Sequence, residues 1–250
     1  QNFLVDQNIV NKIISSIDPK ANQHILEIGP GSGAITKVVA NKVKKVTAIE
    51  IDSNLCEILD KENIPNINII NKDILKVNLN PIKPDIIIGN LPYYITTPII
   101  FKILKSNIKW KEIFFMMQKE VAERIVSKPN LKSYGRLSIM IQILSNPKLL
   151  FNISPQVFRP IPKVNSSLIK MIKTNQYNIK DYNRFEDTIR TIFNQRRKKL
   201  RNCITTEMNL NIGDDCMLLD KRPEQITIKE YVDLINWLDS VRILTKIGGL

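Results

Sequence analysis

The chain has 250 residues, of which 43% are apolar and 24% are charged, and its formal net charge at pH 7 is +13. This length and composition are typical of one large globular domain with at most a small second one. No apolar run approaches the roughly 18 residues that a membrane-spanning helix needs, so no membrane partner is expected. The positive charge favours a polyanionic partner such as a nucleic acid, although it says nothing about the fold.

Histidine and cysteine are scarce, which limits the kinds of site that the chain can build. Cys56, Cys203 and Cys216 are odd in number, lie far apart and form no CxxC motif. Neither a disulfide framework nor a zinc site is therefore expected, and a reducing cytoplasm fits this cysteine usage. The single histidine, His24, directly precedes an apolar run and is expected to be structural. We predict no metal cofactor and little acid–base catalysis by imidazole.

Apolar runs alternate with helical patterns along the first 175 residues. The runs are rich in Ile and lack polar alternation, which is typical of parallel strands covered on both faces. The pattern predicts an α/β fold with a doubly wound, mostly parallel sheet. The expected strands are 24–29, 45–52, 67–74, 84–90, 112–118, 149–154 and 166–173, and the expected helices are 8–17, 34–43, 54–60, 98–105, 119–128 and 135–146.

A polar stretch without periodicity, at about 174–183, follows the last expected strand. We place a domain boundary there and predict two domains, residues 1–175 and 176–250. Helical periodicity dominates the second domain, which is expected to be small and all-helical. Its expected helices are 184–204, 214–219 and 228–240.

A glycine-rich turn follows the first expected strand. The sequence LEIGPGSGAIT places Gly29, Gly31 and Gly33 between a strand and a helix. Glycine lets the backbone turn tightly and approach a ligand, and the helix N-terminus favours an anionic group. The spacing also fits the dinucleotide-binding pattern. It therefore predicts a nucleotide-like cofactor without choosing between NAD and S-adenosylmethionine, while a purely structural turn is the alternative.

Two acidic residues at the ends of the next strands are candidate cofactor ligands. Glu50 ends the second strand, where its carboxylate could accept hydrogen bonds from both hydroxyls of a ribose. Asp73 ends the third strand and could accept a hydrogen bond from the amino group of an adenine. The alternatives are a solvated strand-end acid for Glu50 and a helix N-cap for Asp73.

The sequence NLPY, formed by Asn90, Leu91, Pro92 and Tyr93, follows a run of isoleucines. An adenine amino nitrogen is a poor nucleophile because its lone pair is delocalised into the ring. The side-chain oxygen of Asn90 and a backbone carbonyl at Leu91 or Pro92 could accept its two hydrogens and free that lone pair. Pro92 would hold the turn, and Tyr93 could stack on the base. The motif favours adenine methylation over its alternative, a proline turn with core tyrosines.

The most basic stretch of the chain is RTIFNQRRKKLRN, at residues 190–202. On a helix its cations would spread widely, so several could reach phosphates at once. A solvated charged face is the alternative, and the basic first domain favours RNA. The candidate RNA-binding residues are Arg196, Arg197, Lys198, Lys199 and Arg201.

An ordered set of these motifs resembles the KsgA-type (RsmA) small-subunit ribosomal RNA adenine dimethyltransferases. The set is QNFLVD, EIGPGSGAIT, IEID, NKDIL, GNLPYYITTPI, MMQKEVAERI, SYGRLSIMIQ, FRPIPKVNSSLI and FNQRRKKLRN. The resemblance implies a class I, Rossmann-like S-adenosylmethionine-dependent methyltransferase fold with a seven-stranded sheet, and a small helical RNA-recognition domain. It implies dimethylation of two adjacent adenosines near the 3′ end of 16S rRNA, within a pre-30S particle, by a cytoplasmic monomer that releases S-adenosylhomocysteine.

The resemblance also implies roles for individual residues. Gly29 and Gly31 would cradle the methionine part of the cofactor, and Asn90 would contact both cofactor and target base. Phe158 would flank an extruded adenine opposite Tyr93, which would offset part of the unstacking cost of a few kcal/mol. The full set of implied cofactor-binding residues is Asn2, Leu4, Gly29, Gly31, Glu50, Ile51, Asp73, Ile74 and Asn90.

Three alternative functions also fit parts of the sequence. An Erm-type 23S rRNA adenine methyltransferase shares the expected fold and chemistry. An NAD-dependent dehydrogenase fits the glycine-rich turn but gives NLPY no role. An RNA-binding ribosome assembly factor with little turnover fits the charge. Within GNLPYYITTPI, Tyr94 and Thr96 replace the Asn and Ser that are common in the KsgA-type family, and before the final expected strand Asn165 replaces a common Asp.

Overall fold

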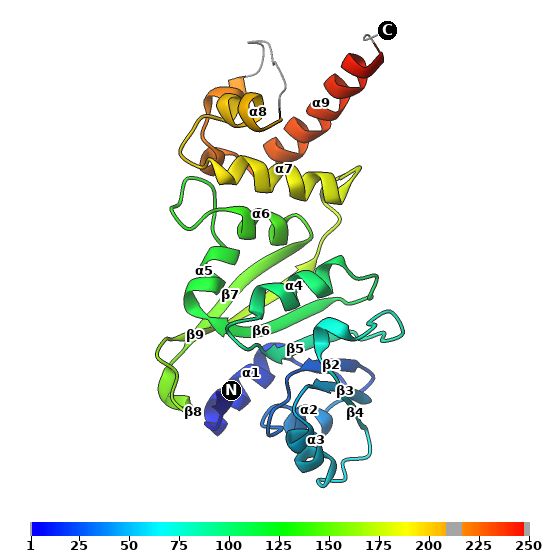
Figure 1. The fold of residues 1–250 in the computed structure, drawn as a ribbon. Helices are drawn as coiled ribbons and strands as arrows, with labels where there is room; N and C mark the ends of the chain where they lie inside the picture. Colours follow the sequence, from blue (N-terminus) through cyan, green and yellow to red (C-terminus); the bar gives the residue numbers. More distant parts are fainter. Residues whose placement is uncertain (1, 209–216, 248–250) are drawn as a thin grey trace. The chain divides into compact units, whose positions relative to one another are not determined.

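The computed structural model describes residues 2–208 and 217–247, and its chain divides into two compact units (Figure 1). The first unit consists of Gln1–Ala122 and Pro147–Lys173, and the second of Glu123–Asn146 and Thr174–Leu250. The predicted boundary after residue 175 lies close to the division at Lys173. The sequence placed residues 123–146 in the first domain, however, and they cluster with the second unit.

The first unit is built on a seven-stranded sheet with the strand order β4-β3-β2-β5-β6-β9-β7. Neighbouring strands from β4 to β6 run parallel, and β9 pairs antiparallel with β6. The strand order reverses at β2, which pairs with both β3 and β5, and open α/β sheets bind ligands at such a point. The strands are β2 (His24–Ile28), β3 (Lys45–Glu50), β4 (Ile67–Asn71), β5 (Ile86–Asn90), β6 (Glu112–Gln118), β7 (Ser145–Ile153) and β9 (Ser166–Lys173).

Helices follow most of these strands, as the sequence predicted. They are α2 (Thr36–Ala40), α3 (Ser53–Asp60), the 3-10 helix η1 (Ile74–Lys76) and α4 (Thr96–Lys105), whereas α1 (Gln7–Ile17) precedes β2. Helix α2 is shorter than the predicted 34–43 at both ends: Ala34 and Ile35 still belong to the glycine-rich turn, and a second turn begins at Asn41.

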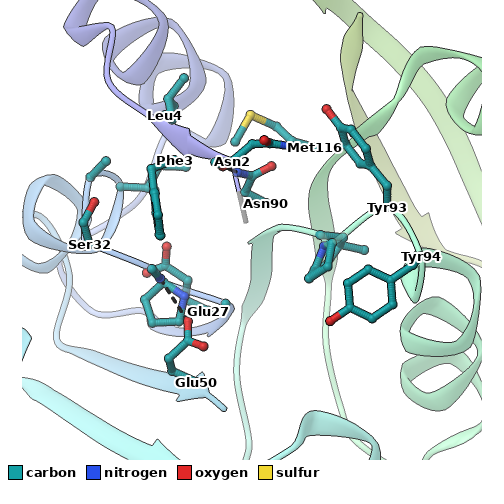
Figure 2. A pocket seen from close by; sticks show the side chains of 17 residues that line it. Asn2, Phe3, Leu4, Glu27, Ser32, Glu50, Asn90, Tyr93, Tyr94 and Met116 are labelled. Carbon is teal, nitrogen blue, oxygen red and sulfur yellow. Dashed lines mark hydrogen bonds between the residues drawn. The ribbon is translucent and has the colours of Figure 1, made fainter. Parts of the chain in front are cut away.

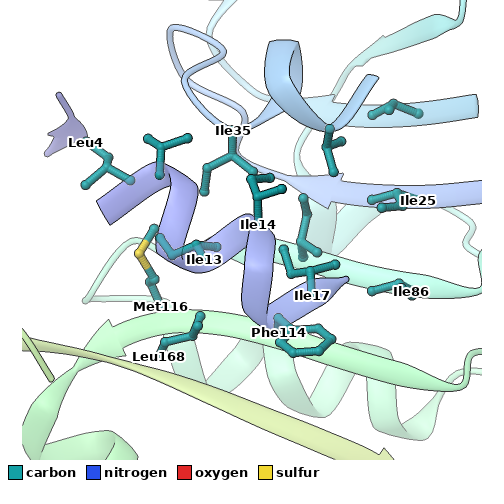
Figure 3. Close-up of a cluster of buried hydrophobic side chains, with 14 of the residues drawn as sticks. Leu4, Ile13, Ile14, Ile17, Ile25, Ile35, Ile86, Phe114, Met116 and Leu168 are labelled. Carbon is teal, nitrogen blue, oxygen red and sulfur yellow. The ribbon is translucent and has the colours of Figure 1, made fainter. Parts of the chain in front are cut away.

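The core between α1 and the sheet is a cluster of packed apolar side chains, mostly aliphatic but including Phe114 and Met116 (Figure 3). Helix α1 begins after Asp6, whose side chain caps the N–H of Ile9 at 3.0 Å, and it buries one apolar face. Ile86 and Ile88 of β5 belong to this cluster, so Ile87 points to the other face of the sheet. The buried isoleucines of α4 lie outside the cluster; they are Ile99, Ile100 and Ile103.

A second, two-stranded sheet ties the N-terminal segment to a distant part of the chain. Strand β1 (Phe3–Leu4) pairs antiparallel with β8 (Phe158–Arg159), and the N–H of Val5 donates to the carbonyl of Val157 at 2.9 Å. The short 3-10 helix η2 (Pro155–Val157) leads into β8. The sequence did not predict this pairing.

The second unit is helical, as the sequence predicted. It includes α6 (Arg136–Gln142), α7 (Tyr182–Asn194), α8 (Leu200–Met208), the 3-10 helices η3 (Met217–Asp220) and η4 (Pro223–Gln225), and α9 (Ile228–Ile247); α5 (Lys119–Ile125) crosses the division between the units. Residues 214–216 of the predicted helix 214–219, with Cys216, lie outside the described residues. None of the helices within the described ranges is long and apolar enough to span a membrane.

The prediction of one continuous helix over 184–204 is wrong. Helix α7 buries Phe185, Ile189 and Ile192 on one face, and the next position in that phase is occupied by Arg196. The apolar stripe therefore ends, a turn follows, and a new apolar set begins with Leu200 of α8.

Candidate functional site

The carboxyl ends of the central strands surround a cavity of about 240 Å³ in the first unit (Figure 2). It lies where the strand order reverses, as expected for a ligand site in an open α/β sheet. Its lining comes from the N-terminal segment, the glycine-rich turn, strands β2, β3, β5 and β6, and the segment after β5. The lining residues are Asn2, Phe3, Leu4, Glu27, Gly29, Pro30, Gly31, Ser32, Ala34, Ile35, Glu50, Asn90, Leu91, Pro92, Tyr93, Tyr94 and Met116.

The glycine-rich turn lies directly on the cavity wall. Gly31 has φ of +57°, a conformation that other L-residues rarely adopt, and a Cβ there would lie 3.1 Å from the ring of Phe3. Its N–H donates to Oε2 of Glu50 at 3.1 Å. The bare backbone of this turn thus forms part of the lining, next to an acid from the neighbouring strand.

Glu50 ends β3, and its side chain is only 3% exposed. Besides Gly31, it accepts hydrogen bonds at Oε1 from the N–H groups of Ile51 and Asp52, at 2.9 and 3.1 Å. These bonds hold the carboxylate against the cavity wall. Because a carboxylate oxygen can accept more than one hydrogen bond, acceptor capacity remains for a ligand.

Glu27 is a lining residue that the sequence analysis missed. It lies on β2, two residues before Gly29, and is 2% exposed, and Oε2 has no hydrogen-bond partner among the described residues. Burial raises the pKa of this carboxyl to about 7; the neighbouring hydroxyl of Thr36 opposes the shift, and the nearby charge of Glu50 adds to it. The only signal in the sequence was an acidic residue just before the glycine motif, and no neighbouring residue indicated that its side chain faces a cavity.

The side chain of Asn90 is fixed by a long-range contact. Asn90 is the last residue of β5, and its Nδ2 donates to the backbone carbonyl of Asn2 at 3.0 Å. No described residue donates a hydrogen bond to Oδ1 of Asn90. The amide therefore presents one free acceptor at the cavity, and Figure 2 shows Asn90 beside Asn2 and Met116.

The rest of NLPY forms a turn between β5 and α4 that is held by hydrogen bonds. The carbonyl of Pro92 accepts from the hydroxyl of Thr96 at 2.9 Å and from the N–H of Ile95 at 3.2 Å. The hydroxyl of Tyr93 shares a 2.8 Å hydrogen bond with that of Ser166 on β9. Tyr93 is half-buried and lines the cavity. The threonine that replaces the common serine thus still provides a hydroxyl that caps the turn.

Four residues of the predicted site do not line the cavity. Ile51 is exposed at the end of β3, and Ile74 is buried in η1. Asp73 caps η1, with Oδ1 accepting the N–H of Leu75 at 2.9 Å, which was the alternative role considered for it. Phe158 is 1% exposed and packs in the hydrophobic core with Leu4. Its contact with a target base, like the cofactor contacts of the other three, stays a prediction.

The candidate RNA-binding residues lie in the turn between α7 and α8 and at the start of α8, in the second unit. Arg196 pairs with Glu224 at 3.0 Å and donates to the carbonyl of Lys132, so it has a structural role. Lys199 pairs with Asp220 at 3.1 Å. Arg197 and Lys198 are exposed, and neither forms an ion pair with a described residue. These two cations are the most available for an external anion.

Comparisons with known proteins agree on the family. A model of the ribosomal RNA adenine dimethylase family matches residues 1–240. A ribosomal RNA small subunit methyltransferase A from Alkaliphilus oremlandii is 38% identical, over 94% of this chain and 89% of its own. One from Bacillus mycoides is 37% identical, over 95% of this chain and 89% of its own.

Two solved structures share the fold. A dimethyladenosine transferase from Plasmodium falciparum has a TM-score of 0.83 and 24% identity, over 95% of this chain and 98% of its own. The 23S rRNA methyltransferase ErmE has a TM-score of 0.70 and 24% identity, over 92% and 99%. With the strand order above, these likenesses confirm the predicted class I methyltransferase fold. Because the family model and the relatives span nearly the whole chain, the chain belongs to the ribosomal RNA adenine dimethylase family.

Proposed function

We propose that the protein dimethylates the N6 amino groups of two adjacent adenosines near the 3′ end of 16S ribosomal RNA, with S-adenosylmethionine as the methyl donor. One observation carries this proposal: the amide of Asn90 lies in the cavity with Nδ2 bound to the carbonyl of Asn2, which leaves Oδ1 as an acceptor. The family to which the chain belongs supports the same chemistry.

Asn90 and Leu91 supply the two acceptors that an adenine amino group needs. The sequence left Leu91 and Pro92 open for the second acceptor. The Pro92 carbonyl already accepts two hydrogen bonds, whereas no described residue donates to that of Leu91, which favours Leu91. Accepting both amino hydrogens draws the nitrogen toward tetrahedral geometry and frees its lone pair. The donor, when bound, supplies an electrophilic sulfonium methyl, so orientation matters more than a strong base.

Two observations support binding of the methyl donor by the lining residues from β2 and the glycine-rich turn. Glu27 has a buried carboxylate oxygen without a partner among the described residues, which suits a positively charged ligand. Gly31 exposes bare backbone where a Cβ would press on Phe3. Glu27 would attract the positive charge of the donor, the glycine turn would hold its methionine part, and Glu50 would accept from its ribose hydroxyls.

The RNA partner is supported by charge. The net charge is +13, and the exposed Arg197 and Lys198 have no ion-pair partner among the described residues. Such cations bind phosphates through release of condensed counterions, so binding should weaken steeply with salt. We propose a pre-30S particle as the substrate, a cytoplasmic monomer as the active form, and the helical residues 176–250 as the RNA-recognition domain.

A side-by-side methylation assay tests the substrate. Unmethylated 30S particles and 23S rRNA transcripts are incubated with labelled S-adenosylmethionine, and the products are analysed by mass spectrometry. We expect N6,N6-dimethyladenosine at two adjacent positions in the 30S particles only. Transfer confined to 23S rRNA would favour an Erm-type enzyme, and tight 30S binding without transfer would favour an assembly factor with little turnover.

A further inference from the structure

We propose that Tyr94 is a stacking platform for the nucleobase that neighbours the extruded target adenine. This inference rests on the proposed function, because it requires an RNA substrate. Tyr94 lines the cavity and yet is 82% exposed, so its ring lies at the rim of the cavity. The hydroxyl of Tyr94 forms no hydrogen bond with a described residue. Such a ring, neither packed nor hydrogen-bonded at the mouth of the cavity, is available to stack on a base of an RNA substrate.

The backbone that carries Tyr94 is held rigidly. The N–H of Ile95 and the hydroxyl of Thr96 both bind the carbonyl of Pro92, at 3.2 and 2.9 Å, and Thr96 is 2% exposed. The exposed ring therefore projects from a fixed turn. Such a preorganised group loses less conformational entropy when it binds than a group on a mobile loop would lose.

The two consecutive tyrosines are placed differently. The hydroxyl of Tyr93 is bonded to Ser166 at 2.8 Å, and Tyr93 is half-buried. Figure 2 shows both rings beside the cavity with their hydroxyls pointing in different directions. Tyr93 is thus tied to the sheet beside Asn90, whereas Tyr94 faces outward. The pair suits two different bases better than the two faces of one base.

The connectivity of the RNA chain places a neighbouring nucleobase next to Tyr94. When one adenine reaches Asn90, its neighbours stay attached through the sugar–phosphate backbone and must lie outside the cavity, at its mouth. Tyr94 is the only exposed large hydrophobic side chain among the described lining residues, so it is the ring that such a neighbour meets. Because the two target adenosines are adjacent, the neighbour on the Tyr94 side is the other adenine in one register and the flanking base in the other, and every base has a face that can stack on an aromatic ring.

Three substitutions at this position separate the ring from the hydroxyl. Tyr94→Phe keeps the ring, Tyr94→Leu keeps only apolar bulk, and Tyr94→Asn introduces the residue common in the resembled family. Ile58→Asn is a matched control, because Ile58 is also an unpacked apolar side chain, 48% exposed on α3, and does not line the cavity. The exposure of Tyr94 predicts that all of its variants fold with unchanged thermal stability.

The readouts are the affinity for unmethylated small-subunit particles, the affinity for S-adenosylmethionine, and the fluorescence of 2-aminopurine placed next to the target adenosine. We expect Tyr94→Leu and Tyr94→Asn to lose roughly tenfold in particle affinity, with unchanged donor affinity. The 2-aminopurine should be brighter in their complexes, because it lacks a stacking partner. Tyr94→Phe and Ile58→Asn should match the wild type in all three readouts.

Two results would overturn the inference. If Tyr94→Leu binds particles as the wild type does and leaves the 2-aminopurine equally quenched, no base stacks on the ring. If the loss appears only in the affinity for S-adenosylmethionine, the ring serves the donor and not the RNA. A donor defect alone would leave the proposed methylation intact, so the two proposals fail separately.

Discussion

The side-chain amide of Asn90 is bonded to the backbone carbonyl of Asn2, 3.0 Å away across 88 residues of sequence. The partner is a main-chain atom, so the orientation of Asn90 depends on where the N-terminal segment runs and not on the side chain at position 2. That segment is held in turn by the pairing of Leu4 with Phe158. The arrangement thereby joins the first residues of the chain to the chemistry at the end of β5.

Replacing Asn2 by Ala should separate cofactor binding from turnover. The backbone carbonyl remains, so Asn90 keeps its orientation and kcat should be preserved. The side chain of Asn2 lines the cavity, so the KM for S-adenosylmethionine should rise, as expected when an interaction common to ground and transition states is removed. Steady-state kinetics with saturating RNA substrate measures both quantities. A fall in kcat with unchanged KM would contradict this division of roles.

Replacing Gly31 by Ala should strain the glycine-rich turn. The residue has φ of +57°, and a Cβ would lie 3.1 Å from the ring of Phe3, so we expect a loss of about 1–2 kcal/mol in the free energy of unfolding. Gly135→Ala is the matched control, because its extended backbone suits any residue and its nearest neighbour would be 3.9 Å away. Equal denaturation midpoints for both variants would show that the turn carries no such strain.

Glu27 should make stability depend on pH. Its pKa is about 7 in the folded protein and 4.5 in the reference state, so between these values the folded state binds more protons than the unfolded state. Stability therefore falls as pH rises from about 4.5 to 7, by at most roughly 3 kcal/mol from this group. Glu27→Gln removes the penalty, so the variant should gain stability over the wild type across that window in urea titrations without ligand. If the pH curves of Glu27→Gln and the wild type run parallel, the pKa of this buried carboxyl is not raised.

The strand–helix alternation and the site motifs could be predicted because their signals are local. A run such as Ile86–Ile88 is apolar at every position, so it predicts a strand covered on both faces wherever it lies. The glycine turn and NLPY are likewise short and contiguous. They meet at one edge because parallel strands end on the same side of the sheet.

Other parts of the site depend on contacts that no short stretch of sequence reveals. The pairing of β1 with β8 and the bond from Tyr93 to Ser166 join residues far apart in the chain. The sequence around Phe158 does not distinguish a phenylalanine that contacts a base from one that packs in the core. The break between α7 and α8 could have been predicted, since Arg196 interrupts the apolar phase of Phe185, Ile189 and Ile192.

Arg197 and Lys198 should contribute to RNA affinity through electrostatics. Replacing both by Gln should weaken binding to small-subunit particles and reduce the slope of log K against log salt by roughly two, about one per phosphate contact. Lys42→Gln with Lys44→Gln is the matched control, because these exposed lysines precede β3, at the edge of the sheet opposite the cavity. If the Arg197 and Lys198 double variant shows the same slope of log K against log salt as the lysine control, the turn between α7 and α8 does not bind phosphates.

The most direct test of the proposed chemistry is methyl transfer by Asn90→Ala, with the affinities for S-adenosylmethionine and for 30S particles measured alongside. Removing the amide takes away an acceptor for the target amine, so kcat should fall by about 10²–10³-fold, by analogy with the loss of one oxyanion-hole donor. Particle affinity should stay within a few-fold of the wild type. Wild-type turnover by this variant would contradict the account, because no other described side chain provides a hydrogen-bond acceptor at the position of the Asn90 amide.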